Sequence, residues 1–284
     1  MKGFIAALRS ELYVAVRSRW PLVLVLAPAA VAAASIFLLE VRAGSLGARA
    51  ALLGRAAPRS AGEGGYGVLV DGLSYGLSFG YLALAAAAAL SIAADRERGT
   101  IRHLLVCRAG RTSCVLAKYA FLMGLGILVF ILVGLSAAAM AALFHDLGPV
   151  VEDGLEIIGV AEIHREIARG VGLALAPLPA AVAFALLISA GARSASGALA
   201  GVLGLTVAFD LLKGGLGGLS RYIYASYSPS LIDRSYLKEV SRLVRGFSDV
   251  FVADETIRLN VLTPWPAALV FLALALWIVH RREM

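Results

Sequence analysis

The chain has 284 residues, of which 60% are hydrophobic and only 16% are charged, and its mean hydropathy is +0.84. Soluble domains have about 45–50% apolar and about 25% charged residues, so this composition excludes an ordinary soluble enzyme or binding domain. The net charge of +7 does not indicate a nucleic-acid partner, because the basic residues lie between long apolar runs, where membrane topology and the lipid bilayer explain them.

The first 19 residues combine an apolar and a basic face. Apolar side chains recur at three- and four-residue spacing, which predicts an amphipathic helix in the cytoplasmic headgroup region. The alternative is a frayed basic tail. Trp20-Pro21 then marks the membrane interface. The apolar residues are Phe4, Ile5, Leu8, Leu12, Tyr13 and Val16, and the cations are Lys2, Arg9, Arg17 and Arg19.

Six apolar runs in residues 20–284 are interpreted as membrane spans. A span needs about 20 predominantly apolar residues. We therefore predict an all-α integral membrane protein with six transmembrane helices, the fourth loosened by Pro177 and Pro179. The predicted spans are 22–39, 73–92, 119–144, 171–190, 197–212 and 264–279, with a loop that can be partly helical over 40–67 and an acidic connection over 145–170.

Residues 213–263 form the longest polar stretch and are predicted to be extracytoplasmic. Apolar residues at helical spacing predict one or two amphipathic helices on, or dipping into, the outer leaflet. This loop also offers a surface for an extracytoplasmic accessory protein. The spacing is carried by Leu237, Val240, Leu243, Val244 and Phe247.

The topology follows from the density of cations near the ends of the spans. Lys and Arg residues are equal in number on the two sides, but those outside are spread over longer segments and offset by acids. Short loops obey the positive-inside rule more strictly than long ones. We expect both termini in the cytoplasm and a multi-pass protein of the inner (plasma) membrane.

Two sets of glycines recur on single helical faces. Small residues at such spacing allow close contact between membrane helices. The alternative is simple tolerance of glycine in Ala-rich segments. The sets are Gly72, Gly76 and Gly80 in the second span, and Gly197, Gly201 and Gly204 in the fifth.

Three ionisable residues lie near the ends of spans: Asp210 with nearby Lys213, and Glu40. Ionisable groups at membrane depth are candidates for function. Their positions near the predicted interfaces favour snorkelling or a local pair between Asp210 and Lys213. The two cysteines and four histidines share no ligand spacing, so no metal site is expected.

The connection between the second and third spans, residues 95–118, is a dense and mostly basic cluster. Such a segment must emerge into water, and its positive charge predicts the cytoplasmic side. Gly99 permits a sharp turn, and Thr100 can cap a short helix over 101–106, whose Leu104 and Leu105 pack on the spans or on a partner. Glu97 can pair with a nearby arginine. The alternative is an ordinary positive-inside loop.

This loop resembles that of the permease subunits of ABC-2 type exporters. Their loop between the second and third spans carries an acidic–basic–Gly–Thr turn, a Leu-Leu pair, a Pro-containing turn ending in Arg, and a Lys that opens the next helix. Arg108 stands where the family usually has Pro. The layout of the whole chain is also similar, including the short connection 191–196. The matching residues are Glu97, Arg98, Gly99, Thr100, Arg102, Leu104, Leu105, Arg111 and Lys118.

The resemblance implies a function in transport. It implies that the loop 95–118 contains a coupling helix seated in an ATP-binding subunit, that residues 1–19 are an elbow helix, and that the permease pairs with a second copy or a paralogue. No Gly-x-x-x-x-Gly-Lys-Ser/Thr loop occurs in the chain. ATP and Mg²⁺ would therefore be bound by separate cytoplasmic ATPase subunits, in two copies, and the chain itself would be neither an enzyme nor a holder of cofactors.

Other classes of membrane protein have less support. An intramembrane hydrolase is disfavoured because no histidine lies inside a predicted span to act as the base of a nucleophile. An ion-coupled secondary transporter would depend on Asp210 and Glu40, without an inverted repeat. A membrane scaffold that holds an external partner through residues 213–263 is the third alternative.

Overall fold

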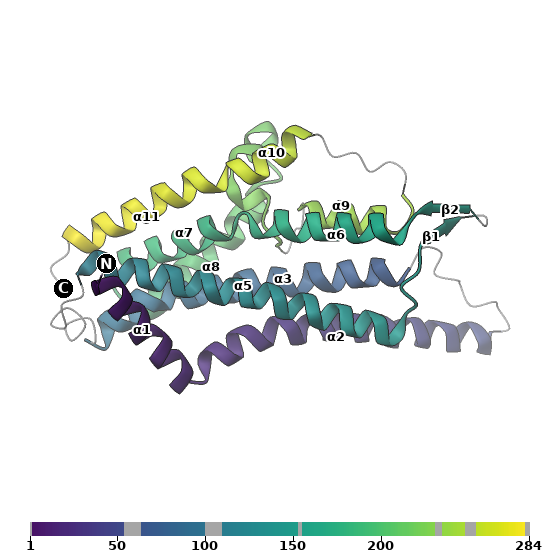
Figure 1. Ribbon diagram of the computed structural model, residues 1–284, viewed down its shortest axis with the longest axis horizontal. Coiled ribbons are helices and arrows are strands. Elements are labelled where there is room, and N and C mark those ends of the chain that lie inside the picture. The colour runs from purple at the N-terminus through teal and green to yellow at the C-terminus, as the bar shows by residue number, and fades with distance from the viewer. Residues whose placement is uncertain are drawn as a thin grey trace.

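The computed structural model describes residues 2–53, 64–99, 110–152, 155–230, 235–247 and 254–281. The helices lie roughly along one axis, and both chain termini lie at the same end of the bundle, here called the terminal end (Figure 1). A two-stranded antiparallel hairpin of β1 (Val150–Glu152) and β2 (Leu155–Ile158) lies at the other end, here called the hairpin end.

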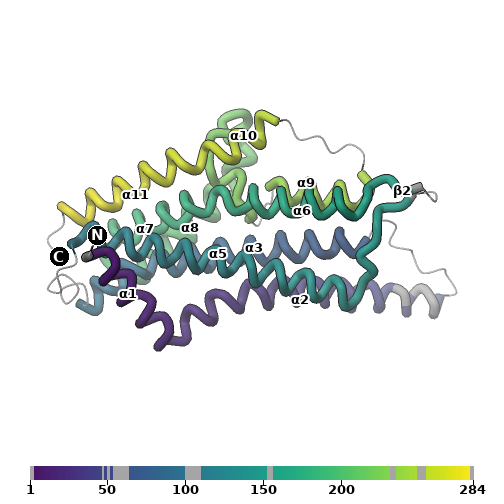
Figure 2. The backbone as a smooth tube through the Cα atoms, viewed as in Figure 1, coloured from purple at the N-terminus to yellow at the C-terminus, as the bar shows by residue number. Residues whose placement is uncertain are grey.

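Three long helices run the length of the bundle: α2 (Trp20–Leu52), α3 (Gly65–Glu97) and α5 (Arg111–Phe144) (Figures 1 and 2). Each has 33 or 34 residues, which corresponds to about 50 Å of helix. The hydrocarbon core of a bilayer is only about 30 Å thick. These helices are therefore long enough to cross the membrane and to continue beyond it.

The remaining spans are shorter or interrupted. The fourth consists of α6 (Val160–Leu175) and α7 (Leu178–Gly191), the fifth is α8 (Ala195–Leu212), and the sixth is α11 (Pro264–Arg281). α7, α8 and α11 lie toward the terminal end, whereas α6 lies toward the hairpin end (Figure 1). Within the described ranges, six helical segments are long and apolar enough to cross a membrane. The predicted all-α membrane fold with six spans is thus confirmed.

One predicted boundary is wrong, and α2 is longer than the first predicted span. α2 continues 13 residues beyond residue 39, as a partly helical connection over 40–67 allows, because residues 40–52 are rich in Ala, Leu and Arg, which favour helix. The fourth crossing begins at Val160 rather than at the predicted residue 171, since the acidic residues between these two positions lie on the amphipathic helix α6. The rest of the predicted loop, residues 54–63, lies outside the described residues.

Pro177 interrupts the fourth crossing, as expected from the two prolines. Proline has no N–H to donate and its ring disrupts the preceding turn, so carbonyl groups before it lose helical partners. The hydroxyl group of Tyr81 donates a hydrogen bond of 2.6 Å to one such carbonyl, that of Ala174. A side chain of α3 thus satisfies the backbone at this break.

The glycines of α3 lie where α2 and α5 approach most closely. A Cβ atom built on Gly76 would lie 2.7 Å from both the Cβ of Ala32 and the Cγ1 of Val133. Gly72 lies against Ile36 and Gly80 against Val129, with equally little space for a Cβ. Each position therefore excludes any larger residue unless a neighbouring helix moves away.

The glycines of α8 differ from those of α3. A Cβ on Gly201 would have Ile188 at 3.4 Å, an ordinary distance, and a Cβ on Gly204 would meet nothing within 4 Å. Gly197 lies only against the oxygen of Ser194, which caps its own helix. Among the residues that the structure describes, this face of α8 contacts no other helix closely.

Residues 213–263 are folded onto the bundle. They form two short 3₁₀ helices, η1 (Gly217–Tyr222) and η2 (Tyr224–Ser226), followed by α9 (Tyr236–Leu243) and α10 (Asp254–Leu262). α9 packs against α3 and α6, and buries Leu237, Val240 and Val244. The predicted placement in the outer leaflet is therefore wrong for α9, because protein covers its apolar face.

Polar contacts fasten this part of the chain at the hairpin end. Asp71 of α3 accepts hydrogen bonds from Ser241, at 2.7 Å, and from Arg245. Tyr236 donates to Glu166 of α6 at 2.6 Å. Burial, together with this hydrogen bond, raises the pKa of Tyr236 to about 12, so its phenol remains a donor at neutral pH.

A substitution of Gly76 tests the close packing of α3. We expect Gly76→Ala to lower the free energy of unfolding by about 1–3 kcal/mol, because the new methyl group would force α2 or α5 outward. Gly134→Ala in α5 is the matched control, since its Cβ would meet nothing within 4 Å and the gain in helix propensity is the same. Denaturation in mixed micelles measures both variants. Equal stability of the two would contradict this packing.

Candidate functional site at the terminal end

Six helix ends lie together at the terminal end (Figure 1). These are the ends of α3, α7 and α11, the starts of α5 and α8, and the N-terminal helix α1 (Lys2–Arg17). Four predicted coupling residues and the predicted short helix over 101–106 lie outside the described residues: Thr100, Arg102, Leu104 and Leu105. The other five are described: Glu97, Arg98, Gly99, Arg111 and Lys118.

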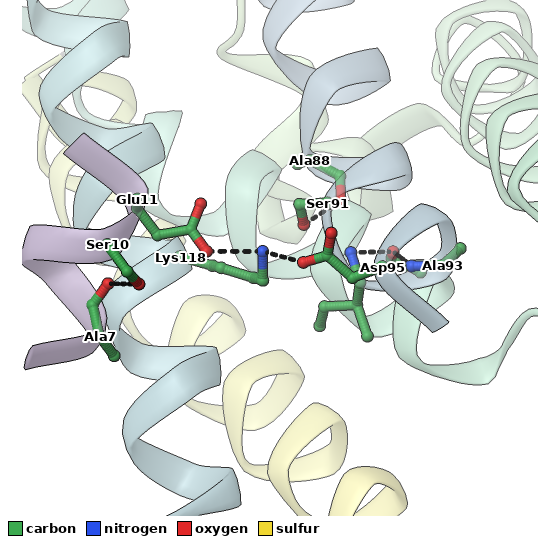
Figure 3. A network of polar contacts seen from close by, with 10 residues as sticks. Ala7, Ser10, Glu11, Ala88, Ser91, Ala93, Asp95 and Lys118 are labelled. Atoms are coloured by element: carbon green, nitrogen blue, oxygen red, sulfur yellow. Dashed lines mark hydrogen bonds and ion pairs between the residues drawn. The ribbon is translucent and has the colours of Figure 1, made fainter. Parts of the chain in front are cut away.

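Lys118 joins three helices through its ammonium group (Figure 3). Its Nζ lies 2.7 Å from Oε1 of Glu11 in α1 and 2.6 Å from Oδ2 of Asp95 in α3. Only 7% of Lys118 is exposed. Lys118, predicted from the sequence as a coupling residue, is therefore an internal link between α1, α3 and α5.

Apolar contacts reinforce the link to α1. Ala7 of α1 and Ala117 of α5 are both buried against each other, and Phe4, Leu8 and Cys114 pack around them. Such small residues allow the two helices to approach closely. Another side of α1 carries large apolar residues that the chain leaves exposed: Ile5, Leu12 and Val16. α1 therefore has one apolar side covered by protein and another that the described part of the chain leaves uncovered.

The end of α3 is fixed to the short connection between α7 and α8. Arg96 donates hydrogen bonds to the carbonyl oxygens of Ala192, at 2.6 Å, and Ala190, at 3.0 Å. Glu97 accepts a hydrogen bond of 3.1 Å from the backbone N–H of Ala195, at the start of α8. Glu97 thus contacts a helix N-terminus, where a negative charge is favoured. Its predicted pairing with Arg102 or with an arginine of a partner involves residues outside those that the structure describes.

Two further residues frame the loop. Gly99 ends α3 with a φ of +70°, a conformation that side chains with a Cβ rarely adopt, and open space surrounds it. On the other side, Arg111 donates a hydrogen bond of 3.1 Å to the carbonyl of His280 in α11. Arg98 is exposed on the last turn of α3. Both flanks of residues 100–109 are therefore fixed to spans distant in sequence.

The sequence analysis missed three residues of this network: Glu11, Asp95 and Arg96. Glu11 is the one acid in the otherwise basic residues 1–19, and that isolation was a usable signal. The pairing itself was not readable, because 107 positions separate Glu11 from Lys118. Arg96 could not be distinguished from its neighbouring arginines without knowing which carbonyls end α7.

The other ionisable candidates are held in local pairs. Nζ of Lys213 lies 2.5 Å from Oδ1 of Asp210, which confirms the predicted pair, and Ser230 bridges both groups. Glu40 lies 2.6 Å from Nε2 of His145. A secondary transporter would need a carboxylate that binds and releases ions, and these pairs do not favour that role. Within the described ranges no group of His, Cys, Asp and Glu could hold a metal ion.

Removal of the Lys118 ammonium group tests the three-helix link. We expect Lys118→Met to lower the free energy of unfolding by up to about 3 kcal/mol, since it leaves two carboxylates in a poorly solvated site. Lys238→Met is the control, because Lys238 is exposed and has no ion pair with the described residues. Unfolding in mixed micelles gives both values.

A triple variant distinguishes charge from packing in this test. Combining Lys118→Met with Glu11→Gln and Asp95→Asn removes all three charges, so most of the lost stability should return. If the triple variant is as unstable as Lys118→Met alone, the ion pairs are not what holds α1 to the bundle.

Comparison with known proteins agrees with this architecture. A family model described as ABC-2 family transporter protein matches residues 5–283, nearly the whole chain. No curated protein matches the chain significantly. The match includes the six membrane-crossing helices and every described residue of the network at the terminal end except those before residue 5. The chain is a multi-pass membrane protein that belongs to the ABC-2 family of transporter proteins.

Proposed function

We propose that this chain is the permease subunit of an ATP-driven exporter and works with two cytoplasmic ATPase subunits. Family membership makes it the membrane component of an ABC-type transporter. The absence of a phosphate-binding loop from its sequence supports a separate source of ATP hydrolysis, with ATP and Mg²⁺ bound in the partner. The second permease in the complex is another copy of this chain or a paralogue.

In this proposal the terminal end faces the cytoplasm of a cell whose inner (plasma) membrane holds the protein. Arginines are dense around residues 95–118 and at the C-terminus, whereas the connection at the hairpin end is acidic. Positive charge near the ends of spans favours the cytoplasmic side. α1 then lies at the cytoplasmic interface as an elbow helix, with its uncovered apolar residues in the headgroup region.

The observation that carries the proposal is the anchoring of both flanks of residues 100–109. Glu97 and Arg96 connect the loop to the junction of α7 and α8, and Arg111 connects it to α11. Lys118 connects the same helix ends to α1. A displacement of the loop by an ATPase would therefore reach several spans at once. Such a mechanical connection is what coupling requires.

The same region contains exposed groups suited to contact with a partner. Arg98 and Glu97 are exposed on the last turn of α3, and Gly99 follows in open space. Exposed charges of both signs favour orientation of a docking partner through electrostatic complementarity. We assign Gly99, together with the loop residues Thr100, Arg102, Leu104 and Leu105, to the ATPase contact.

Replacement of Gly99 tests this assignment. Gly99→Trp places a bulky side chain at the proposed contact and strains a backbone with φ of +70°. We expect it to abolish substrate-stimulated ATP hydrolysis in the complex that copurifies with the tagged chain, with normal membrane insertion. Gly217→Trp is the control, because Gly217 also has a positive φ, of +52°, and open space, but lies away from the terminal end.

Two results would contradict the proposal. One is normal stimulation of ATP hydrolysis by the Gly99→Trp protein. The other is purification of a chain that transports its cargo without any ATP-hydrolysing partner.

A further inference from the structure

An open cleft of about 710 Å³ lies at the terminal end, beside the link made by Lys118. Five helices contribute to its walls: α1, the first residue of α2, α3, α5 and the start of α8. Small-molecule sites in proteins have about 300–1,000 Å³, so this volume can hold a ligand of substantial size. The contacts described above use only the charged side of this cleft.

The walls change from charged to apolar along the axis of the bundle. Asp95, Arg98 and Lys118 lie where the apolar runs of α3 and α5 end. Deeper along the same helices the walls become apolar, and Trp20 lies at the start of α2, against the ring of Phe121. This change from charged to apolar walls matches the change from headgroups to acyl chains in one leaflet of a bilayer. The apolar wall consists of Val14, Trp20, Ala87, Leu90, Phe121 and Leu122.

Much of the apolar wall is uncovered by the chain. Trp20 is 41% exposed, Val14 is 55% exposed and Leu90 is 37% exposed. Adjacent large apolar residues left open in this way indicate a surface that binds lipid or another apolar partner. Since Trp20 stands at the membrane interface, a lipid of the surrounding leaflet can reach the cleft without crossing water.

On the charged side of the cleft, one cationic and one anionic group can each accept a further contact from a ligand. Arg98 is exposed, and its guanidinium has no hydrogen bond or ion pair with the described residues. Glu11 contacts Lys118 through Oε1, and no donor from the described part of the chain reaches its Oε2. A ligand that carries both a negative and a positive group would complement this pair, whereas a purely anionic ligand would meet the carboxylate as well.

We propose that the cleft binds an aminophospholipid from the leaflet at the terminal end. Its phosphate lies at Arg98, because guanidinium groups bind phosphate oxygens in a bidentate manner. Its primary ammonium donates to Glu11, and an acyl chain covers Trp20 and Leu90. A choline headgroup has no N–H to donate, so it satisfies the phosphate contact alone. This binding requires only the permease chain and does not depend on coupling to an ATPase.

Fluorescence of Trp20 can detect the lipid directly. Trp265→Phe and Trp277→Phe leave Trp20 as the single tryptophan of the full-length chain. The chain is placed in nanodiscs of phosphatidylglycerol that contain increasing amounts of a phospholipid brominated on the upper part of its acyl chains. Brominated phosphatidylethanolamine, phosphatidylcholine and phosphatidylglycerol are compared, because contact with bulk lipid quenches equally for all three.

The expected result is half-maximal quenching at about tenfold lower mole fraction for phosphatidylethanolamine than for phosphatidylcholine, the factor that one hydrogen bond between charged groups supplies. Glu11→Gln should remove this preference, because it removes the carboxylate that accepts from the ammonium, while Asp95 still pairs with Lys118. Arg98→Gln and Arg9→Gln should keep it, since the phosphate contact at Arg98 is common to the three lipids and Arg9 is an exposed residue of α1 outside the cleft.

Three results would overturn the proposal. They are equal quenching by the three lipids, a preference for phosphatidylglycerol, and a preference for phosphatidylethanolamine that persists in Glu11→Gln. None of these bears on coupling, which the Gly99 variants test through ATP hydrolysis.

Discussion

The ammonium group of Lys118, shared between Glu11 and Asp95, is the interaction on which the terminal end depends. A charge held where water is scarce cannot lose its partners one at a time without a large cost in free energy. α1, α3 and α5 are therefore constrained to keep their relative positions. That constraint places the N-terminal helix beside the loop and forms one wall of the cleft, so the proposed docking site and the lipid site share one support.

Movement of this end is connected to the rest of the molecule by rigid packing. Gly72, Gly76 and Gly80 let α3 pack so closely against α2 and α5 that a side chain larger than that of glycine has no space between the helices. Hydrogen bonds from Arg96 and Glu97 add the junction of α7 and α8. A force on the end of α3 is thus shared among spans, because these contacts permit movement of groups of helices more readily than bending of one.

The sequence was sufficient for the features that depend on one segment. Apolar runs predicted the six spans because the hydrocarbon of the bilayer excludes polar segments. The spacing of three residues predicted the ion pair between Asp210 and Lys213. Features that depend on two segments were missed. Periodicity showed that α9 has an apolar face, but it could not show that α3 and α6, rather than lipid, cover Leu237 and Val240. The link from Glu11 to Lys118 spans too much sequence to be seen by spacing. The predicted residues in 100–109 remain predictions.

The interruption at Pro177 gives the fourth crossing a property that an intact helix lacks. Bending a continuous helix in hydrocarbon would break amide hydrogen bonds with no water to replace them. Here the carbonyl of Ala174 accepts a hydrogen bond from the phenol of Tyr81, a buried side chain of α3. The break at Pro177 therefore leaves this carbonyl with a donor from another helix, and that hydrogen bond links the fourth crossing to the second.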